Sequence, residues 1–112
     1  MRGEILDAFR PDGNNGIDIK APVGEPVHAG GDGVCMFAGT LDPYGKLILI
    51  RHDHGFVTAY GLNSELLVKQ GDPVKRGQII AKSGEDGGLP RLHFEIRKDS
   101  KPVDPTKFLV PL

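Results

Sequence analysis

Several features that would point to a particular class of protein are scarce or missing in this 112-residue sequence. It has no tryptophan and a single cysteine, Cys35, so an internal disulfide is excluded. No apolar run approaches the roughly 20 residues of a membrane-spanning helix. The 14 basic and 15 acidic residues give a net charge of −1, without the basic excess expected of a nucleic-acid-binding domain. We therefore expect no nucleic-acid partner and no membrane span.

Glycine and proline are abundant instead, with 16 and 9 residues, and they separate short runs of β-favouring residues. Helical periodicity is hard to find between them, so the pattern predicts an all-β fold. We expect a compact antiparallel β-sheet or β-sandwich, with residues 1–112 forming a single domain. Residues 47–51 predict a central strand, residues 61–67 and 84–88 predict irregular segments, and residues 106–109 predict a helical turn.

The most informative stretch is residues 89–97, in which apolar and polar residues alternate for most of its length. Alternation with this period predicts a strand with one buried face. A polar face that carries a histidine fits either the solvated surface of an edge strand or the floor of a site, because histidine is a common metal ligand and general base. The pattern places Leu92, Phe94 and Ile96 on the buried face, and Arg91, His93, Glu95 and Arg97 on the other.

Further short motifs accompany this strand in a fixed order along the chain. They are Gly16-Ile17-Asp18-Ile19, Pro26-Val27-His28-Ala29, Asp32-Gly33-Val34, Tyr44-Gly45 before residues 47–50, Thr58-Ala59-Tyr60, residues 74–80 and Leu92-His93-Phe94-Glu95. In this order and spacing, they resemble the LytM, or lysostaphin-type, zinc metallopeptidase domain over about residues 13–109. Active members of that family cleave peptide bonds in peptidoglycan. Their zinc is bound by a His-x-Gly-x-Asp motif and by the second histidine of a His-x-His motif, and two further histidines assist catalysis.

The sequence departs from this family pattern at three of the five functional positions. Asp18 and His93 match zinc ligands, but Asn14 occupies the remaining ligand position, while Leu62 and Arg91 replace the two assisting histidines. An amide oxygen is a poor ligand for zinc, Arg91 stays protonated, and Leu62 cannot transfer a proton. We therefore expect no zinc or other cofactor and no peptidase activity. We also expect an ion pair between Arg91 and Asp18, because a buried carboxylate without metal or partner would be costly.

Degenerate LytM domains of this kind occur in murein hydrolase activators of the NlpD, EnvC and DipM group, which the run 91–97 resembles. The resemblance implies binding and activation of periplasmic N-acetylmuramyl-L-alanine amidases during daughter-cell separation in the cell envelope of a Gram-negative bacterium. Since no secretory signal or lipid-anchor sequence is present, we expect the chain to be a fragment of a longer envelope protein. We expect the partner to bind the former catalytic groove through Tyr60, Leu62, Arg91, His93, Glu95 and Arg97.

Three alternative interpretations remain open from the residues. The domain could be a weak zinc endopeptidase that uses Asp18, His93 and another group, or a module whose groove binds peptidoglycan without cleaving it. Residues 69–78 also resemble a turn of biotinyl and lipoyl carrier domains. The carrier interpretation is disfavoured because those domains usually attach their group to a lysine beside methionine, and no Met-Lys pair occurs.

Overall fold

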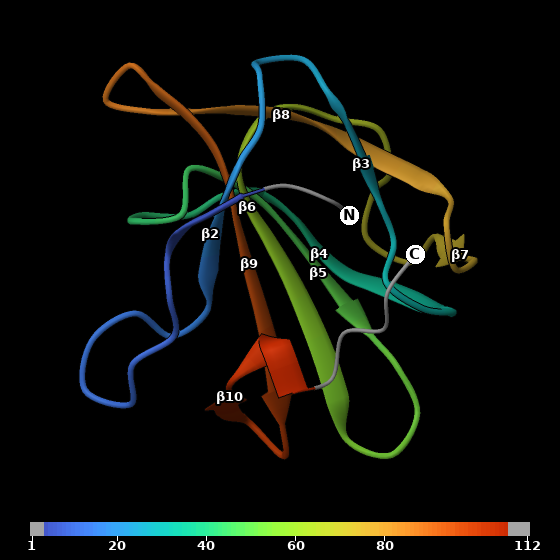
Figure 1. Ribbon diagram of the computed structural model, residues 1–112. Helices are drawn as coiled ribbons and strands as arrows, with labels where there is room; N and C mark the ends of the chain where they lie inside the picture. The colour runs from blue at the N-terminus through green and yellow to red at the C-terminus, as the bar shows by residue number, and fades with distance from the viewer. Residues whose placement is uncertain (1–3, 108–112) are drawn as a thin grey trace.

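Strand β9 (Leu89–Lys98) is the central strand of the computed structural model, which describes residues 4–107 (Figure 1). Four strands pair with it, all antiparallel: β2 (Ile17–Lys20), β6 (Phe56–Leu66), β8 (Ile79–Asp86) and β10 (Lys101–Val103). The sheet also contains β1 (Ile5–Asp7), β3 (Pro26–His28), β4 (Gly33–Thr40), β5 (Lys46–Arg51) and β7 (Pro73–Val74). This arrangement confirms the predicted all-β antiparallel fold.

The predicted elements agree with the structure in part. Residues 47–51 form most of β5, which lies inside the sheet between β4 and β6. The expected helical turn is the 3₁₀ helix η1 (Pro105–Lys107), although residues 108 and 109 lie outside the described part. The two predicted irregular segments, 61–67 and 84–88, are wrong for most of their length, because β6 continues to Leu66 and β8 to Asp86; only residues 87 and 88 form the expected turn. Gly84 suggested the end of a strand, but it lies within β8 and allows β8 to pack closely against β6. A Cβ on Gly84 would lie 2.6 Å from the carbonyl oxygen of Leu62.

The register around β9 decides which side chains meet. Asp18 of β2 is paired with His93 on one side, and Gly61 of β6 is paired with His93 on the other. Tyr60 is paired with Phe94. Directly paired residues point to the same face of a sheet, so the polar and apolar faces of β9 continue into both neighbouring strands.

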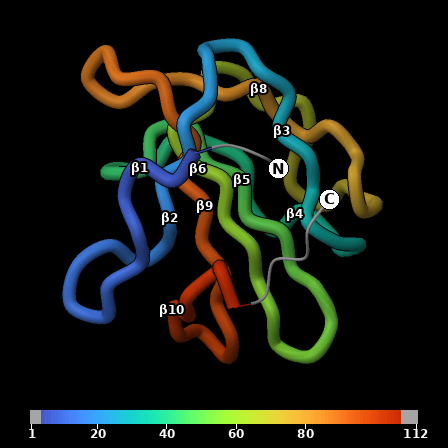
Figure 2. Tube along the Cα trace, in the orientation of Figure 1, coloured from blue at the N-terminus to red at the C-terminus, as the bar shows by residue number. Residues whose placement is uncertain are grey.

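The core lies on the face of β9 that carries Leu92 and Phe94, which are 1% and 6% exposed. Val27 of β3 and Ile80 of β8 belong to the same buried cluster. β3 and β8 lie together at one end of the molecule and β10 at the opposite end (Figures 1 and 2). Within residues 4–107, no helix has the length and apolar character needed to cross a membrane.

The loop that precedes β2 lies directly against β9 because residue 16 is a glycine. A Cβ at Gly16 would clash with the carbonyl group of Phe94 and would lie 2.6 Å from Cγ of Glu95. Glycine is the residue that allows such a close approach of one backbone to another strand. The loop therefore holds Asn14 next to the polar face of β9, and β2 begins close enough to place Asp18 there as well.

Candidate functional site

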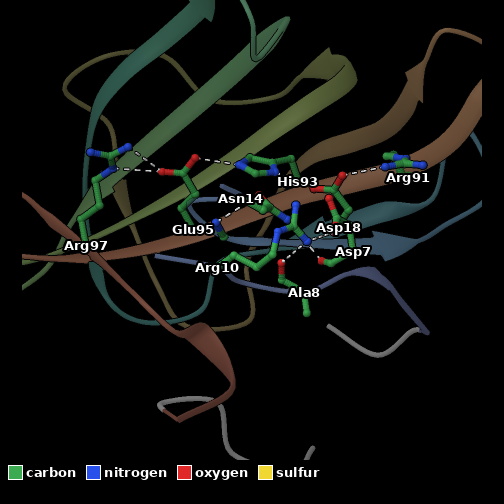
Figure 3. Close-up of polar contacts among 10 residues, drawn as sticks. Asp7, Ala8, Arg10, Asn14, Asp18, Arg91, His93, Glu95 and Arg97 are labelled. Carbon is green, nitrogen blue, oxygen red and sulfur yellow. Dashed lines mark hydrogen bonds and ion pairs between the residues drawn. The ribbon is translucent and has the colours of Figure 1, made fainter. Parts of the chain in front are cut away.

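Five charged side chains form a continuous row along the polar face of β9, which we call the ion chain: Arg91, Asp18, His93, Glu95 and Arg97. Figure 3 shows them in this order, with the two arginines at the ends. The Nη1 atom of Arg91 donates to Oδ2 of Asp18 at 2.7 Å, and Nδ1 of His93 lies 2.6 Å from Oδ1 of Asp18. Nε2 of His93 lies 2.7 Å from Oε2 of Glu95, and Nε of Arg97 donates to Oε1 of Glu95 at 3.0 Å. The predicted ion pair between Arg91 and Asp18 is therefore confirmed.

The row follows from strand periodicity and register together. Four of its members are alternate residues of β9, so their side chains share one face. Asp18 enters from β2 because its Cα is paired with that of His93. Each anion thereby lies between two nitrogen-bearing groups, an arrangement that the sequence spacing of residues 18 and 93 does not reveal.

His93 carries a positive charge in this arrangement. Carboxylate oxygens only accept hydrogen bonds, so an imidazole between Asp18 and Glu95 donates from both ring nitrogens and is protonated. Burial by itself would lower the pKa of His93, but the hydrogen bonds and charges of the two carboxylates outweigh it and raise the pKa to about 9.

The two carboxylates respond in the opposite direction. Burial favours the neutral acid, yet hydrogen bonds from His93 and Arg91 hold the pKa of Asp18 below its usual range. Burial likewise opposes ionisation of Glu95, while His93 and Arg97 lower its pKa. Both acids are thus ionised at neutral pH, and each has cationic neighbours.

The donor set does not suit a zinc ion as it is arranged. Both oxygens of Asp18 and both ring nitrogens of His93 are already engaged within the ion chain. The amide of Asn14 is used locally: its Nδ2 donates to the carbonyl of Asp7, and its Oδ1 accepts from the backbone N–H of Gly16, each at 3.3 Å. Within residues 4–107, no group of three His, Cys, Asp or Glu side chains is placed to hold a metal. The guanidinium of Arg91 would also repel a divalent cation.

A groove opens above the middle of the ion chain, and we call it the ion-chain groove. It encloses about 210 Å³ and is lined by Asn14, Asp18, Pro43, Tyr44, Leu62, Asp86 and His93. The ring of Tyr44 lies 5.5 Å from that of His93, measured between centroids. Sequence reasoning identified four of these residues and missed Pro43, Tyr44 and Asp86. The Pro43-Tyr44-Gly45 turn before β5 could have indicated Pro43 and Tyr44 from the sequence.

Leu62 reaches the groove through an irregularity in β6. Its backbone has φ of +64°, which is uncommon for a non-glycine residue. Its N–H donates to the carbonyl of Tyr44 at 2.8 Å. The next side chain, Asn63, donates to the carbonyls of Lys46 and Tyr60 at 2.9 and 2.7 Å. These bonds hold the bulge between β5 and β6 and explain how a leucine occupies this backbone conformation.

Two residues predicted to form the partner surface are not on it. Tyr60 is 1% exposed and lies on the core face, where its hydroxyl bonds Thr58 Oγ1 at 2.7 Å and accepts from the Gly30 N–H at 2.9 Å. The prediction was wrong because the register pairs Tyr60 with Phe94 rather than with a polar residue of β9. Glu95 is in the polar row, but it too is 1% exposed and is covered by its neighbours. It supports the row without offering a surface to a partner.

The remaining predicted residues fall in different places. Leu62 and His93 line the ion-chain groove. Arg91 and Arg97 end the ion chain, with side chains 16% and 31% exposed. The structure therefore brings four of the six predicted residues to the ion chain or to the groove above it.

Comparison with known proteins shows that the sequence pattern of peptidase family M23 matches residues 12–105. A Pseudomonas aeruginosa protein named lipoprotein NlpD/LppB homolog is 45% identical over 111 residues, covering 96% of this chain and 37% of that protein. The murein hydrolase activator NlpD of Escherichia coli is 40% identical over 111 residues, covering 96% of this chain and 29% of its own length. The chain thus spans well under half of these relatives.

Solved structures also resemble the fold. The crystal structure of a zinc-containing peptidase from Vibrio cholerae superposes with a TM-score of 0.87 and 34% sequence identity. The match covers 97% of this chain and 37% of that one. The chain therefore shares its architecture with a protein described as a zinc-containing peptidase.

Proposed function

Because this chain belongs to peptidase family M23, we propose that it is a non-catalytic member, which regulates cell-wall hydrolysis by binding and activating an N-acetylmuramyl-L-alanine amidase. The observation that carries this proposal is the bond from the guanidinium of Arg91 to Asp18. Active members of the family use the carboxylate at the Asp18 position to bind zinc. The names of the relatives support a role in activating murein hydrolases. The proposal extends to location in the periplasm of a Gram-negative bacterium, within a longer envelope protein.

The absence of zinc is part of the proposal. The carboxylate of Asp18 would otherwise need a metal to balance its charge. Arg91 and protonated His93 both pair with it, and His93 also pairs with Glu95. Elemental analysis of the purified domain should find no stoichiometric zinc. One tightly held zinc per chain, together with cleavage of peptidoglycan peptides, would instead support the endopeptidase alternative.

Activation requires that the domain favour one state of the amidase. A partner shifts a two-state equilibrium only as far as it binds one state better than the other. We propose that the domain binds the open amidase at the ion-chain groove, where Leu62 supplies apolar surface beside His93 and Tyr44. Apolar anchors surrounded by polar groups are typical of strongly contributing interface residues.

The test is an amidase dye-release assay with labelled peptidoglycan. Arg91→Ala and Leu62→Glu should both reduce activation, the first by opening the end of the row and the second by placing an anion against the partner. Lys82→Ala, an exposed position on β8, is the control and should activate normally. Loss of the Arg91 partner leaves Asp18 less satisfied and is expected to cost roughly 1–3 kcal/mol, so thermal melts must show that each variant is folded at the assay temperature. Full activation by both folded variants would place the contact surface elsewhere.

A further inference from the structure

A second and larger groove lies next to the first on the same face of the sheet. It encloses about 330 Å³, compared with about 210 Å³ for the ion-chain groove. Tyr44 lines both grooves and forms the boundary between them. We call this one the sheet groove; its apolar lining consists of Met36, Leu41, Leu47, Leu49, Val57 and Ala59.

Two of the apolar side chains in the sheet groove are exposed to solvent. Met36 of β4 is 41% exposed and Leu41, just after β4, is 49% exposed. Single exposed apolar residues are normal on protein surfaces, but these two share a groove whose remaining walls are also largely apolar. Clustering of this kind is typical of a surface that a partner covers.

The two grooves carry charges of opposite sign. Arg97 lines the sheet groove and is the most exposed member of the ion chain. Its Nε and Nη2 contact Glu95, which leaves further guanidinium N–H groups for another acceptor. The ion-chain groove, on the other side of Tyr44, is lined by the exposed residue Asp86 of β8. Among residues 4–107, no ion pair includes Asp86.

We propose that one amphipathic segment of the amidase crosses Tyr44 and lies over both grooves in a fixed direction. Its apolar side chains cover Met36 and Leu41, an acidic side chain faces Arg97, and a basic side chain faces Asp86. The inference rests on the proposed function and adds the chemistry and direction of the bound segment. Complementary charges at the two ends fix the register of the segment, while the apolar contacts supply most of the affinity.

The apolar part is tested by calorimetric titration of the purified domain with the intact amidase. The double variant Met36→Gln/Leu41→Gln should bind at least about tenfold more weakly, because two apolar contacts are replaced by amides that must be desolvated. The matched control is Leu67→Gln/Ile79→Gln, at positions 44% and 46% exposed that line neither groove. The control should bind like the unmodified domain, and thermal melts should show both double variants folded.

The charged part is tested at two adjacent positions on β8. Asp86→Lys should weaken binding about tenfold by repelling the basic side chain of the segment. Glu85→Lys changes the net charge equally, but neighbouring residues of a strand point to opposite faces, and Glu85 does not line the groove. It should therefore have a much smaller effect.

The outcomes separate this inference from the proposed function. If Leu62→Glu abolishes activation while the Met36/Leu41 variant binds normally, the amidase uses the ion-chain groove alone and the inference is overturned. Equal effects of Asp86→Lys and Glu85→Lys would show a response to net charge and would overturn the proposed direction. If the unmodified domain does not bind the amidase, both the function and the inference fail.

Discussion

Stability should fall as the pH rises through the alkaline range, because folding raises the pKa of His93. The ordinary pKa is 6.5 and the folded value is about 9. A group whose pKa is raised on folding contributes its full stabilisation below the unfolded pKa and loses it as the pH rises through the folded one. At 1.36 kcal/mol per pKa unit, the rise corresponds to roughly 3 kcal/mol, a large part of the 5–15 kcal/mol that is typical for the free energy of unfolding of a domain.

Urea unfolding at a series of pH values measures this loss directly. Between about pH 6 and about pH 9.5, the unmodified domain should lose most of this stabilisation, whereas His93→Gln should be less stable in acid and nearly flat across the same range. The buried thiol of Cys35 also has a raised pKa, because burial disfavours the thiolate, so it adds its own loss of stability above about pH 9. That loss is shared by both proteins, and the difference between their curves isolates His93. Parallel curves would refute the account of His93 as a buried imidazolium held by two carboxylates.

Two further predictions concern the departures from the zinc-binding pattern. The double variant Asn14→His/Arg91→His restores an imidazole at the vacant ligand position and removes the competing cation, so it should bind zinc in a calorimetric titration with zinc chloride, whereas Arg91→His alone should bind it much more weakly. At Leu62, where φ is +64°, Leu62→Asn should be at least as stable as the unmodified domain in urea unfolding, because asparagine tolerates this conformation. Leu62→Val should be less stable by roughly 1–2 kcal/mol because a β-branched side chain crowds the backbone there; equal stability of the two variants would contradict the argument.

The alternation along residues 89–97 was enough to predict a strand with an apolar face and a charged face. Leu92 and Phe94 are buried and Arg91 and Arg97 are on the opposite face, as that pattern requires. Side chains on a strand alternate for purely local geometric reasons, so this information is contained in the sequence. The dense spacing of glycine and proline likewise sufficed to predict an all-β antiparallel fold.

The pairing of Arg91 with Asp18 was also predictable, although the two residues are 73 positions apart. The prediction rested on the resemblance to a zinc-binding domain and on the cost of burying an unpaired carboxylate. Neither argument predicted the contacts among His93, Glu95 and Arg97 that complete the ion chain. That His93 lies between Asp18 and Glu95 and is protonated depends on the register of β2 against β9.

What only the tertiary structure decided is the face on which each neighbouring residue lies. Tyr60 was expected beside the groove and is in the core, because its pairing with Phe94 places its side chain on the core face. Tyr44 and Leu62 meet at the groove through a bulge and a backbone hydrogen bond that leave no periodic trace in the sequence. Local periodicity thus determined which residues of β9 are polar or buried, whereas long-range pairing determined which of them form a surface that a partner can reach.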